Sequence, residues 1–253
     1  WAPVCCTFLR KRGKTMQHSI QGILFDKDDT LIDLAAFCRK PIYMTAAYLS
    51  QHMGKGTDEG WIERLAEASG FRGDTLLADA PIVSGTNRDL MEAWRTVLRT
   101  GGMQLSEELA QNALDYLQWA CEHHGNLKAR ADLPALLQKL KARSIRLGVA
   151  TSDDYLPTVQ CLRALGVAHL FDAVFGADRV PNPKPAPDIA RMFCSQYGLL
   201  PEQVAMVGDS ANDMLFAKNS GITGVFFRPD GWEGPLPEGA QLCIQDLEQV
   251  ASL

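Results

Sequence analysis

Five short apolar segments recur along the chain, and each of them ends at polar or charged residues. They cover residues 20–25, 145–150, 173–175, 204–207 and 222–227. Apolar residues at consecutive positions over this length are typical of strands that are buried on both faces of a sheet. A segment with helical spacing of apolar residues precedes each of the last four. This alternation predicts an α/β fold, with a Rossmann-like, three-layer α/β/α core around a parallel sheet.

The pattern changes between residues 33 and 130. Segments 43–52, 61–68, 88–98 and 107–123 have helical spacing, and nothing there strongly predicts a strand. We therefore expect an inserted α-helical cap domain, residues 34–128, and a core formed by residues 18–33 and 129–253. Residues 1–17 carry a short basic cluster. They are expected to be an N-terminal tail or an added extension, with a mitochondrial targeting segment as the alternative.

Composition narrows the classes of partner. The sequence is 46% hydrophobic and 22% charged, with a formal net charge of −5. A mildly acidic chain has no electrostatic reason to bind nucleic acid or an anionic membrane, so neither partner is expected. The seven cysteines include no Cys-x-x-Cys pair, which disfavours a zinc ribbon and a disulfide framework. Reduced thiols in a cytoplasmic protein are expected instead, and the oligomeric state stays open between monomer and dimer.

Three acidic residues follow the first apolar segment. In an open parallel sheet, ligands bind beyond the carboxyl ends of the strands, so Asp26, Asp28 and Asp29 are candidates for chemistry. Carboxylates this close repel one another unless a cation compensates them, and Mg²⁺ takes oxygen ligands of this kind. A carboxylate can also attack phosphorus while a second one transfers a proton. A solvated acidic turn that caps the next helix is the alternative interpretation.

Three more strand ends carry polar groups that suit phosphate or metal. Thr151 and Ser152 open a helix, where hydroxyl and backbone N–H groups can bind a phosphate oxygen. Lys184 lies in a proline-rich loop that restricts the backbone. Asp209 and Asp213 are spaced so that both can lie on one side of the first turn of a helix. Taken singly, helix capping or a solvated loop explains each of these groups equally well.

Taken together, the four groups resemble the motifs of the haloacid dehalogenase (HAD) superfamily of phosphohydrolases. The motifs are Asp-x-Asp-x-Thr (Asp26, Asp28, Thr30), a hydroxyl after the second strand (Thr151), a lysine ahead of a helix (Lys184) and Gly-Asp-x-x-x-Asp (Asp209, Asp213). The resemblance covers about residues 18–33 and 129–228. The helical insert lies where that superfamily places its type 1 cap.

The resemblance implies a Mg²⁺-dependent phosphatase that hydrolyses a small phosphomonoester through an aspartyl-phosphate intermediate. Asp26 is the implied nucleophile. Asp28 is the implied general acid and base, and it also binds the metal through its backbone carbonyl. The phosphoryl group is held by Thr151, Ser152 and Lys184, and the Mg²⁺ site is completed by Asp26, Asp209 and Asp213.

Details of the motifs separate the subfamilies. Dehalogenases and phosphonatases of this superfamily lack the second aspartate, so Asp28 argues against both activities. The runs around Asp26 and Asp209 are most similar to phosphoglycolate-phosphatase-type members. One departure is Asp29, which stands where those enzymes usually have glycine. The alternative functions are a phosphomutase of the same superfamily and a non-catalytic phosphate-binding protein with this fold.

Several residues of the insert have weaker claims to function. Candidate contacts to an anionic substrate are Arg39, Lys40 and Arg88. The tryptophans, Trp61, Trp94 and Trp119, are expected in the core of the insert rather than on a platform for substrate. The adjacent His123 and His124 do not share a face of a helix, which disfavours a joint metal site.

Overall fold

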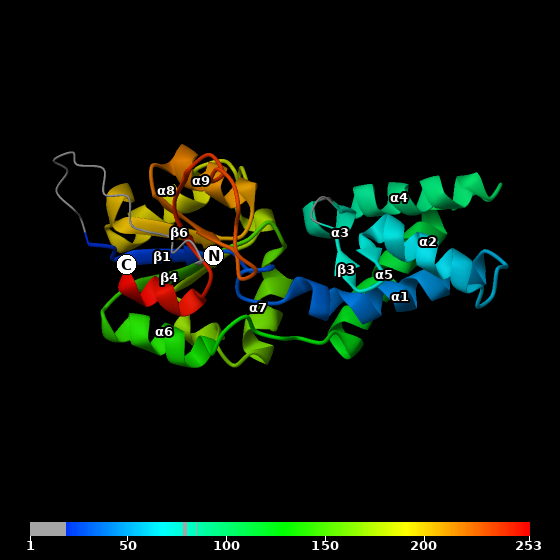
Figure 1. Cartoon of the computed structure of the whole chain (residues 1–253), viewed down its shortest axis with the longest axis horizontal. Coiled ribbons are helices and arrows are strands. Elements are labelled where there is room, and N and C mark those ends of the chain that lie inside the picture. Colours follow the sequence, from blue (N-terminus) through cyan, green and yellow to red (C-terminus); the bar gives the residue numbers. More distant parts are fainter. Residues whose placement is uncertain (1–18, 78–79, 85) are drawn as a thin grey trace, which may run out of the picture.

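A six-stranded parallel sheet forms the centre of the molecule, in the order β5-β4-β1-β6-β7-β8. The computed structural model describes residues 19–77, 80–84 and 86–253, so the predicted tail lies outside the described residues. Figure 1 shows the sheet at one end of the elongated molecule and the helical insert at the other. The strands are β1 (Gly22–Phe25), β4 (Arg146–Ala150), β5 (Ala173–Phe175), β6 (Val204–Gly208), β7 (Thr223–Phe227) and β8 (Ala240–Ile244).

Helices cover both faces of the sheet because alternate strand residues are apolar on both sides. Ile23 and Phe25 belong to one buried cluster, which also contains Leu136 of α6. Leu24 belongs to the cluster on the opposite face, together with Phe193 of α8. The covering helices are α6 (Leu133–Ala142) and α7 (Tyr155–Ala164) on the first face and α8 (Asp188–Tyr197) and α9 (Ala211–Ser220) on the second. The predicted three-layer α/β/α core is confirmed.

Strand β8 was not predicted. It lies at an edge of the sheet, and only Ile244 of its residues is fully buried. Its sequence, Ala-Gln-Leu-Cys-Ile, therefore lacks the continuous apolar run that identified the five inner and opposite-edge strands. An edge strand with one solvated face leaves a weaker hydrophobic signal than a strand covered on both faces.

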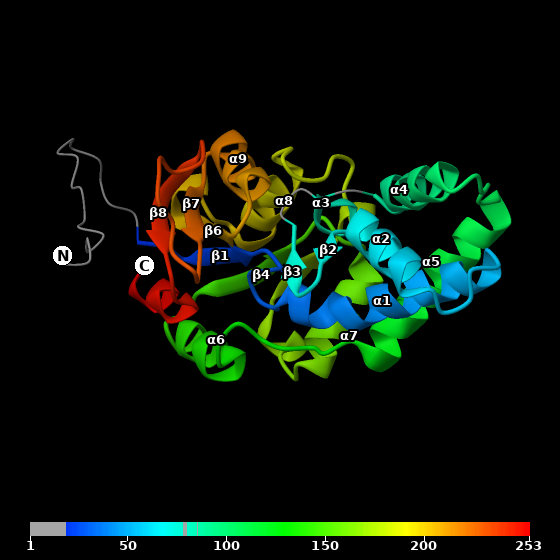
Figure 2. The same ribbon diagram turned by 45° about the vertical axis from the view of Figure 1, so that its right-hand side comes forward.

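The insert has a hydrophobic core of its own, distinct from the two clusters on the sheet. Its helices are α1 (Leu34–His52), α2 (Glu59–Ser69), α3 (Pro81–Ser84), α4 (Asn87–Thr100) and α5 (Glu107–His124). Figure 2 shows α1 and α5 side by side, and these two helices share more contacts than any other pair of the insert. The insert also contains a short hairpin that no strong strand pattern predicted, formed by β2 (Phe71–Arg72) and β3 (Thr75–Leu76).

Two further expectations for the insert need correction. Helix α1 begins at Leu34, well before the predicted start at residue 43, because Pro41 lies inside the helix and interrupts the sequence signal. Trp94 is buried as expected, but Trp119 is 42% exposed and does not belong to the core. Trp119 lies off the buried face of α5 and stacks on His123 instead.

Two features of the described residues bear on the class of protein. None of the helices in the described part of the chain has the length and hydrophobicity needed to cross a membrane. The described cysteines, Cys38, Cys121, Cys161, Cys194 and Cys243, form no disulfide with one another.

Candidate active site

The carboxyl edge of the sheet brings three carboxylates together. Asp26 follows β1 and Asp209 follows β6, and these strands are neighbours in the sheet. Asp213 lies in the first turn of α9, directly after the same loop. One oxygen of each carboxylate lies within 4.8 Å of the others. Oxygen ligands at this spacing fit a single hard divalent cation such as Mg²⁺.

Lys184 provides a buried positive charge in this cluster. Its Nζ donates to Asp26 Oδ1 at 2.7 Å and to Asp213 Oδ1 at 2.5 Å. All three side chains are nearly inaccessible to solvent. Burial lowers the pKa of Lys184, but Asp213 and Asp26 outweigh that effect and raise it above the usual range. The ammonium is therefore charged, and the proline-rich loop holds it against two carboxylates from distant parts of the chain.

One lysine does not compensate the negative charge of the cluster. Burial raises the pKa of Asp26 to about 7, although Lys184 opposes the shift. Burial and the charges of Asp26 and Asp213 raise the pKa of Asp209 to about 8. Thr30 donates a hydrogen bond to Asp209 Oδ1 at 3.2 Å. Carboxyl groups whose ionised forms are this unfavourable are typical of sites that bind a cation or transfer protons.

The turn between β6 and α9 is shaped around Asp213. Ser210 caps α9: its hydroxyl accepts from Asp213 N, and it donates to Asp213 Oδ2 at 2.5 Å. A Cβ atom at Gly208 would lie 2.5 Å from Asp213 Cγ. Glycine is therefore required at this position because the Asp213 carboxylate lies against it.

Asp28 lies in a second ion-pair group next to the first. Lys27 Nζ donates to Asp28 Oδ1 at 2.7 Å and pairs with Asp153 Oδ2 at 3.1 Å. Burial raises the pKa of Asp28, and Lys27 opposes the shift. Within the described residues, no hydrogen bond or ion pair joins the Asp28 carboxylate to Asp26. Its charge nevertheless contributes to the raised pKa of Asp26.

Lys27 lies at this edge of the sheet but was not predicted as a site residue. Its side chain is only 6% exposed, although lysines are rarely buried without a partner. A lysine between two aspartates, directly after a buried strand, was the available signal. Its two carboxylate partners show that the side chain belongs to the edge of the sheet and not to a solvated turn.

The predicted phosphate-binding hydroxyls differ in exposure. Thr151 follows β4, which is the other neighbour of β1, and it is buried. Its hydroxyl accepts from Asp153 N at 3.1 Å, so it caps the turn that leads to α7. Ser152 is exposed. Both lie at the same edge as the acidic cluster, as the strand order requires.

The basic residues proposed as substrate contacts have no hydrogen bond or ion pair to the acidic cluster within the described residues. Arg39 pairs with Asp74 of the β2–β3 hairpin turn, and both are solvent-exposed. Lys40 and Arg88 are exposed. None of these three bonds to a residue of the sheet edge within the described part of the chain. Their assignment to substrate stays a prediction.

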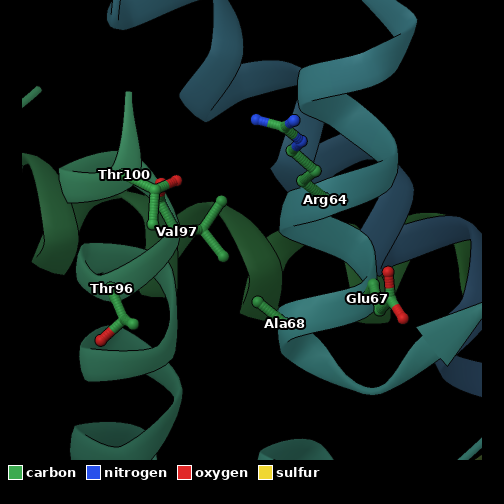
Figure 3. Close-up of a pocket in the computed structure, with 6 residues that line it drawn as sticks. All are labelled: Arg64, Glu67, Ala68, Thr96, Val97 and Thr100. Atoms are coloured by element: carbon green, nitrogen blue, oxygen red, sulfur yellow. The ribbon is translucent and has the colours of Figure 1, made fainter. Parts of the chain in front are cut away.

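Figure 3 shows a hollow between α2 and α4, inside the insert. It has a volume of about 280 Å³ and is lined by Arg64, Glu67, Ala68, Thr96, Val97 and Thr100. None of these residues belongs to the acidic cluster, and the hollow is open to solvent. The carboxylates at the sheet edge, and not this hollow, are therefore the candidate site for chemistry.

Comparison with known proteins agrees with the geometry of this edge. The haloacid dehalogenase-like hydrolase family matches residues 20–221. A phosphoglycolate phosphatase of Pasteurella multocida is 36% identical over 90 residues, which is 36% of this chain and 40% of that protein. The chain thus aligns with about two fifths of the length of that curated relative.

Solved structures share the fold along most of the chain. An HAD phosphatase from Thermococcus onnurineus has 25% sequence identity and a TM-score of 0.59, over 92% of this chain and 97% of that one. An HAD-superfamily hydrolase of subfamily IA from Geobacter sulfurreducens has 19% identity and a TM-score of 0.63, over 92% and 95% of the two chains. With the family match over most of the sequence and the acidic cluster at the edge of the sheet, this chain belongs to the haloacid dehalogenase-like hydrolase family.

Proposed function

We propose that this chain is a phosphatase that hydrolyses a small phosphomonoester of the phosphoglycolate type, with Asp26 as the nucleophile. The observation that carries the proposal is the buried cluster of Asp26, Lys184 and Asp213 beside Asp209. A buried cluster with more carboxylates than cations is costly, and it suits an anionic phosphoryl group only with a further positive charge. The name of the Pasteurella relative supports the type of substrate.

Asp26, Asp209 and Asp213, with the backbone carbonyl of Asp28, are the residues that would hold Mg²⁺. Their oxygen atoms, their spacing and the raised pKa values of Asp26 and Asp209 suit a hard divalent cation. When bound, the metal would neutralise negative charge on the phosphoryl group. Lys184 adds a fixed positive charge on the side of Asp26 and Asp213.

The reaction proceeds in two steps through the carboxylate of Asp26. An Asp26 oxygen attacks phosphorus, the bond from phosphorus to the ester oxygen breaks, and Asp28 donates a proton to the leaving alcohol. Water then attacks the phosphorus of the aspartyl-phosphate, Asp28 accepts the proton, and phosphate leaves. Burial raises the pKa of Asp28, while the charge of Lys27 and its hydrogen bond to Asp28 Oδ1 oppose the shift. Lys184 bonds to Asp26 Oδ1 and orients the carboxylate.

Thr151 and Ser152 are the proposed ligands of the phosphoryl oxygens. Thr151 is buried at the end of the strand beside β1, so its hydroxyl has a fixed position. Ser152 is exposed and is free to contact a bound substrate. The insert is the proposed cap, whose helices would exclude bulk water from the reacting groups.

The test is phosphate release from a panel of small phosphomonoesters, including phosphoglycolate and sugar phosphates, with Mg²⁺ and with EDTA. We expect release that requires Mg²⁺ and that is fastest for one small ester. Isomerisation of a sugar phosphate without phosphate release would identify a mutase instead. Absence of turnover with every ester in the presence of Mg²⁺ would contradict the proposed function.

A further inference from the structure

Two linkers connect the insert to the core, and they are joined to each other where they pass. The outgoing linker runs from the loop of Asp26 to the start of α1, and the returning linker follows α5. Arg130 N donates to Leu31 O at 3.0 Å, and Asp33 N donates to Lys128 O at 2.9 Å. This pairing is a single antiparallel bridge, so side chains have to supply much of the linkage.

The side chains of Asp29 and Arg130 supply this linkage between the two linkers. The Arg130 guanidinium donates to Asp29 Oδ1 and lies 3.7 Å from Asp33 Oδ1. The same Asp29 oxygen accepts from Leu34 N at the start of α1. Each of the two charged side chains is less than a quarter exposed. One arginine thus ties the returning linker to the catalytic loop and to the first turn of the insert.

The backbone at Asp29 makes this pair more than a surface contact. Its φ angle is +54°, in the left-handed region that favours glycine. The position tolerates a side chain because aspartate adopts this conformation more readily than most residues. In the sequence, Asp29 stands between Asp28 and Thr30, and the Thr30 hydroxyl bonds to Asp209.

An unpaired charge at this position would be felt in the acidic cluster. Asp29 belongs to the short loop that carries Asp26 and Asp28, so a negative charge on it acts at short range on the proposed metal and phosphate site. The Arg130 guanidinium lies on Asp29 and opposes that effect, because opposite charges in contact cancel at longer range. Among the described residues, Arg130 pairs with carboxylates through its terminal nitrogen, whereas its buried Nε has no hydrogen-bond partner there.

We propose that Arg130 is a positioning residue for the acidic cluster. Arg130 pairs with Asp29, so the Asp29 carboxylate fixes the two linkers without adding its charge to the metal and phosphate site. The proposal rests on the proposed function. It also accounts for an aspartate at a backbone position that suits glycine. Arg130 touches neither substrate nor the reacting atoms in this account, and it acts only through Asp29.

The charge-based role predicts opposite effects on a cation and an anion. In Arg130→Met, the unpaired Asp29 carboxylate should strengthen binding of Mg²⁺ alone and weaken binding of inorganic phosphate, each about 3-fold to 10-fold. Both changes should be reversed in Asp29→Gly/Arg130→Met. Asp29→Gly alone should shift the two affinities in the opposite direction, weaker for Mg²⁺ and tighter for phosphate, by no more than about 3-fold, because Arg130 still lies 3.7 Å from Asp33 Oδ1. Arg130→Lys keeps the charge and should resemble the parent.

Thermal-shift titrations with MgCl₂ and with sodium phosphate measure both affinities without turnover. The kcat and KM for p-nitrophenyl phosphate supply an independent reading, in which KM rises for Arg130→Met and falls again in the double variant. The matched control is Arg95→Met, because Arg95 is also 22% exposed and pairs with Glu107 inside the insert. This control should leave both ion affinities unchanged.

The proposal is overturned if Arg130→Met weakens Mg²⁺ and phosphate together, since loss of linker structure and not of charge would then explain the defect. It is also overturned if the double variant is as impaired as Arg130→Met, or if Arg130→Met binds both ions like the parent. If the parent protein hydrolyses no ester, the proposed function fails by itself. The ion titrations still decide the role of Arg130.

Discussion

The ion pairs of Lys184 at the carboxyl edge of the sheet are buried and join distant parts of the sequence, whereas the ion pairs of the helical insert include exposed ones between residues close in sequence. Lys184 bonds to Asp26, 158 residues away, and both are at most 10% exposed. Arg72 pairs with Glu67, five residues away, and both are about half exposed or more. Exposed local pairs stabilise little, while burying charge is costly and is retained where it acts.

The core and the insert therefore have different roles. The edge of the sheet holds the residues proposed to attack phosphorus, neutralise charge and transfer protons. The insert is stabilised by apolar packing around residues such as Trp94. A substitution at the edge should therefore change activity more than stability. A substitution in the core of the insert should change stability first.

The largest expected effect is on activity at Asp26. Asp26→Asn should lower kcat by on the order of 10⁴-fold, because the amide is a poor nucleophile. The unfolding midpoint should stay the same or rise, since the variant removes a buried charge from a negative cluster. Phosphate release and thermal unfolding measure the two quantities. Asp115→Asn, on an exposed part of α5, is the matched control and should alter neither.

The next effect is on stability at Trp94. Trp94→Ala should lower the free energy of unfolding by about 3–5 kcal/mol, because it opens a cavity and leaves Ser69 without its indole donor. Trp119→Ala is the control from the same insert and should cost less than about 1 kcal/mol, since this side chain is 42% exposed. Denaturant unfolding measures the free energy of unfolding of both variants and of the parent protein. Equal losses in the two variants would contradict the division between a packed core and an exposed stack.

A smaller effect is expected from metal and pH. Asp26 and Asp209 have pKa values raised to about 7 and about 8, so the folded protein binds protons that the unfolded chain has released. Without metal, their contribution to stability is complete below about pH 4 and is lost as the pH rises through 7 and 8. Mg²⁺ should offset this loss by about 2.7 kcal/mol at a hundredfold excess over Kd.

Thermal unfolding at pH 6 and pH 8.5, with and without Mg²⁺, checks this prediction. The stabilisation by Mg²⁺ should be larger at pH 8.5, where protons no longer compete for the carboxylates. Asp209→Asn should reduce it at both values. A stabilisation that is larger at pH 6 would contradict the assignment of the acidic cluster as the metal site.

The sequence predicted the groups at the strand ends because strand order follows from a simple pattern. Runs of apolar residues identified the strands, and polar residues directly after them had to meet at one edge. Strand β8 was not predicted, because an edge strand needs no continuous apolar run. The start of α1 escaped because Pro41 is tolerated inside that helix by its surroundings, which no local pattern contains.

The side-chain partners at the edge could not be predicted from the sequence. Lys27 and Lys184 both lie next to acidic residues in the chain or in the fold, yet one pairs with Asp28 and the other with Asp26. Which carboxylate each lysine reaches depends on the positions of β4, β6 and their loops. The pairing of Arg130 with Asp29 depends on the passage of two linkers that are a hundred residues apart in sequence.

The proposed mechanism forms a covalent bond between Asp26 and phosphorus, and a chemical trap can detect this bond. The enzyme is mixed with Mg²⁺ and its best phosphomonoester, quenched within one turnover and treated with borohydride, which reduces an acyl phosphate to an alcohol. We expect homoserine at position 26 in the digested protein, only when Mg²⁺ and substrate are both present. Phosphate release with an unmodified Asp26, or with the modification at another carboxylate, would contradict the mechanism.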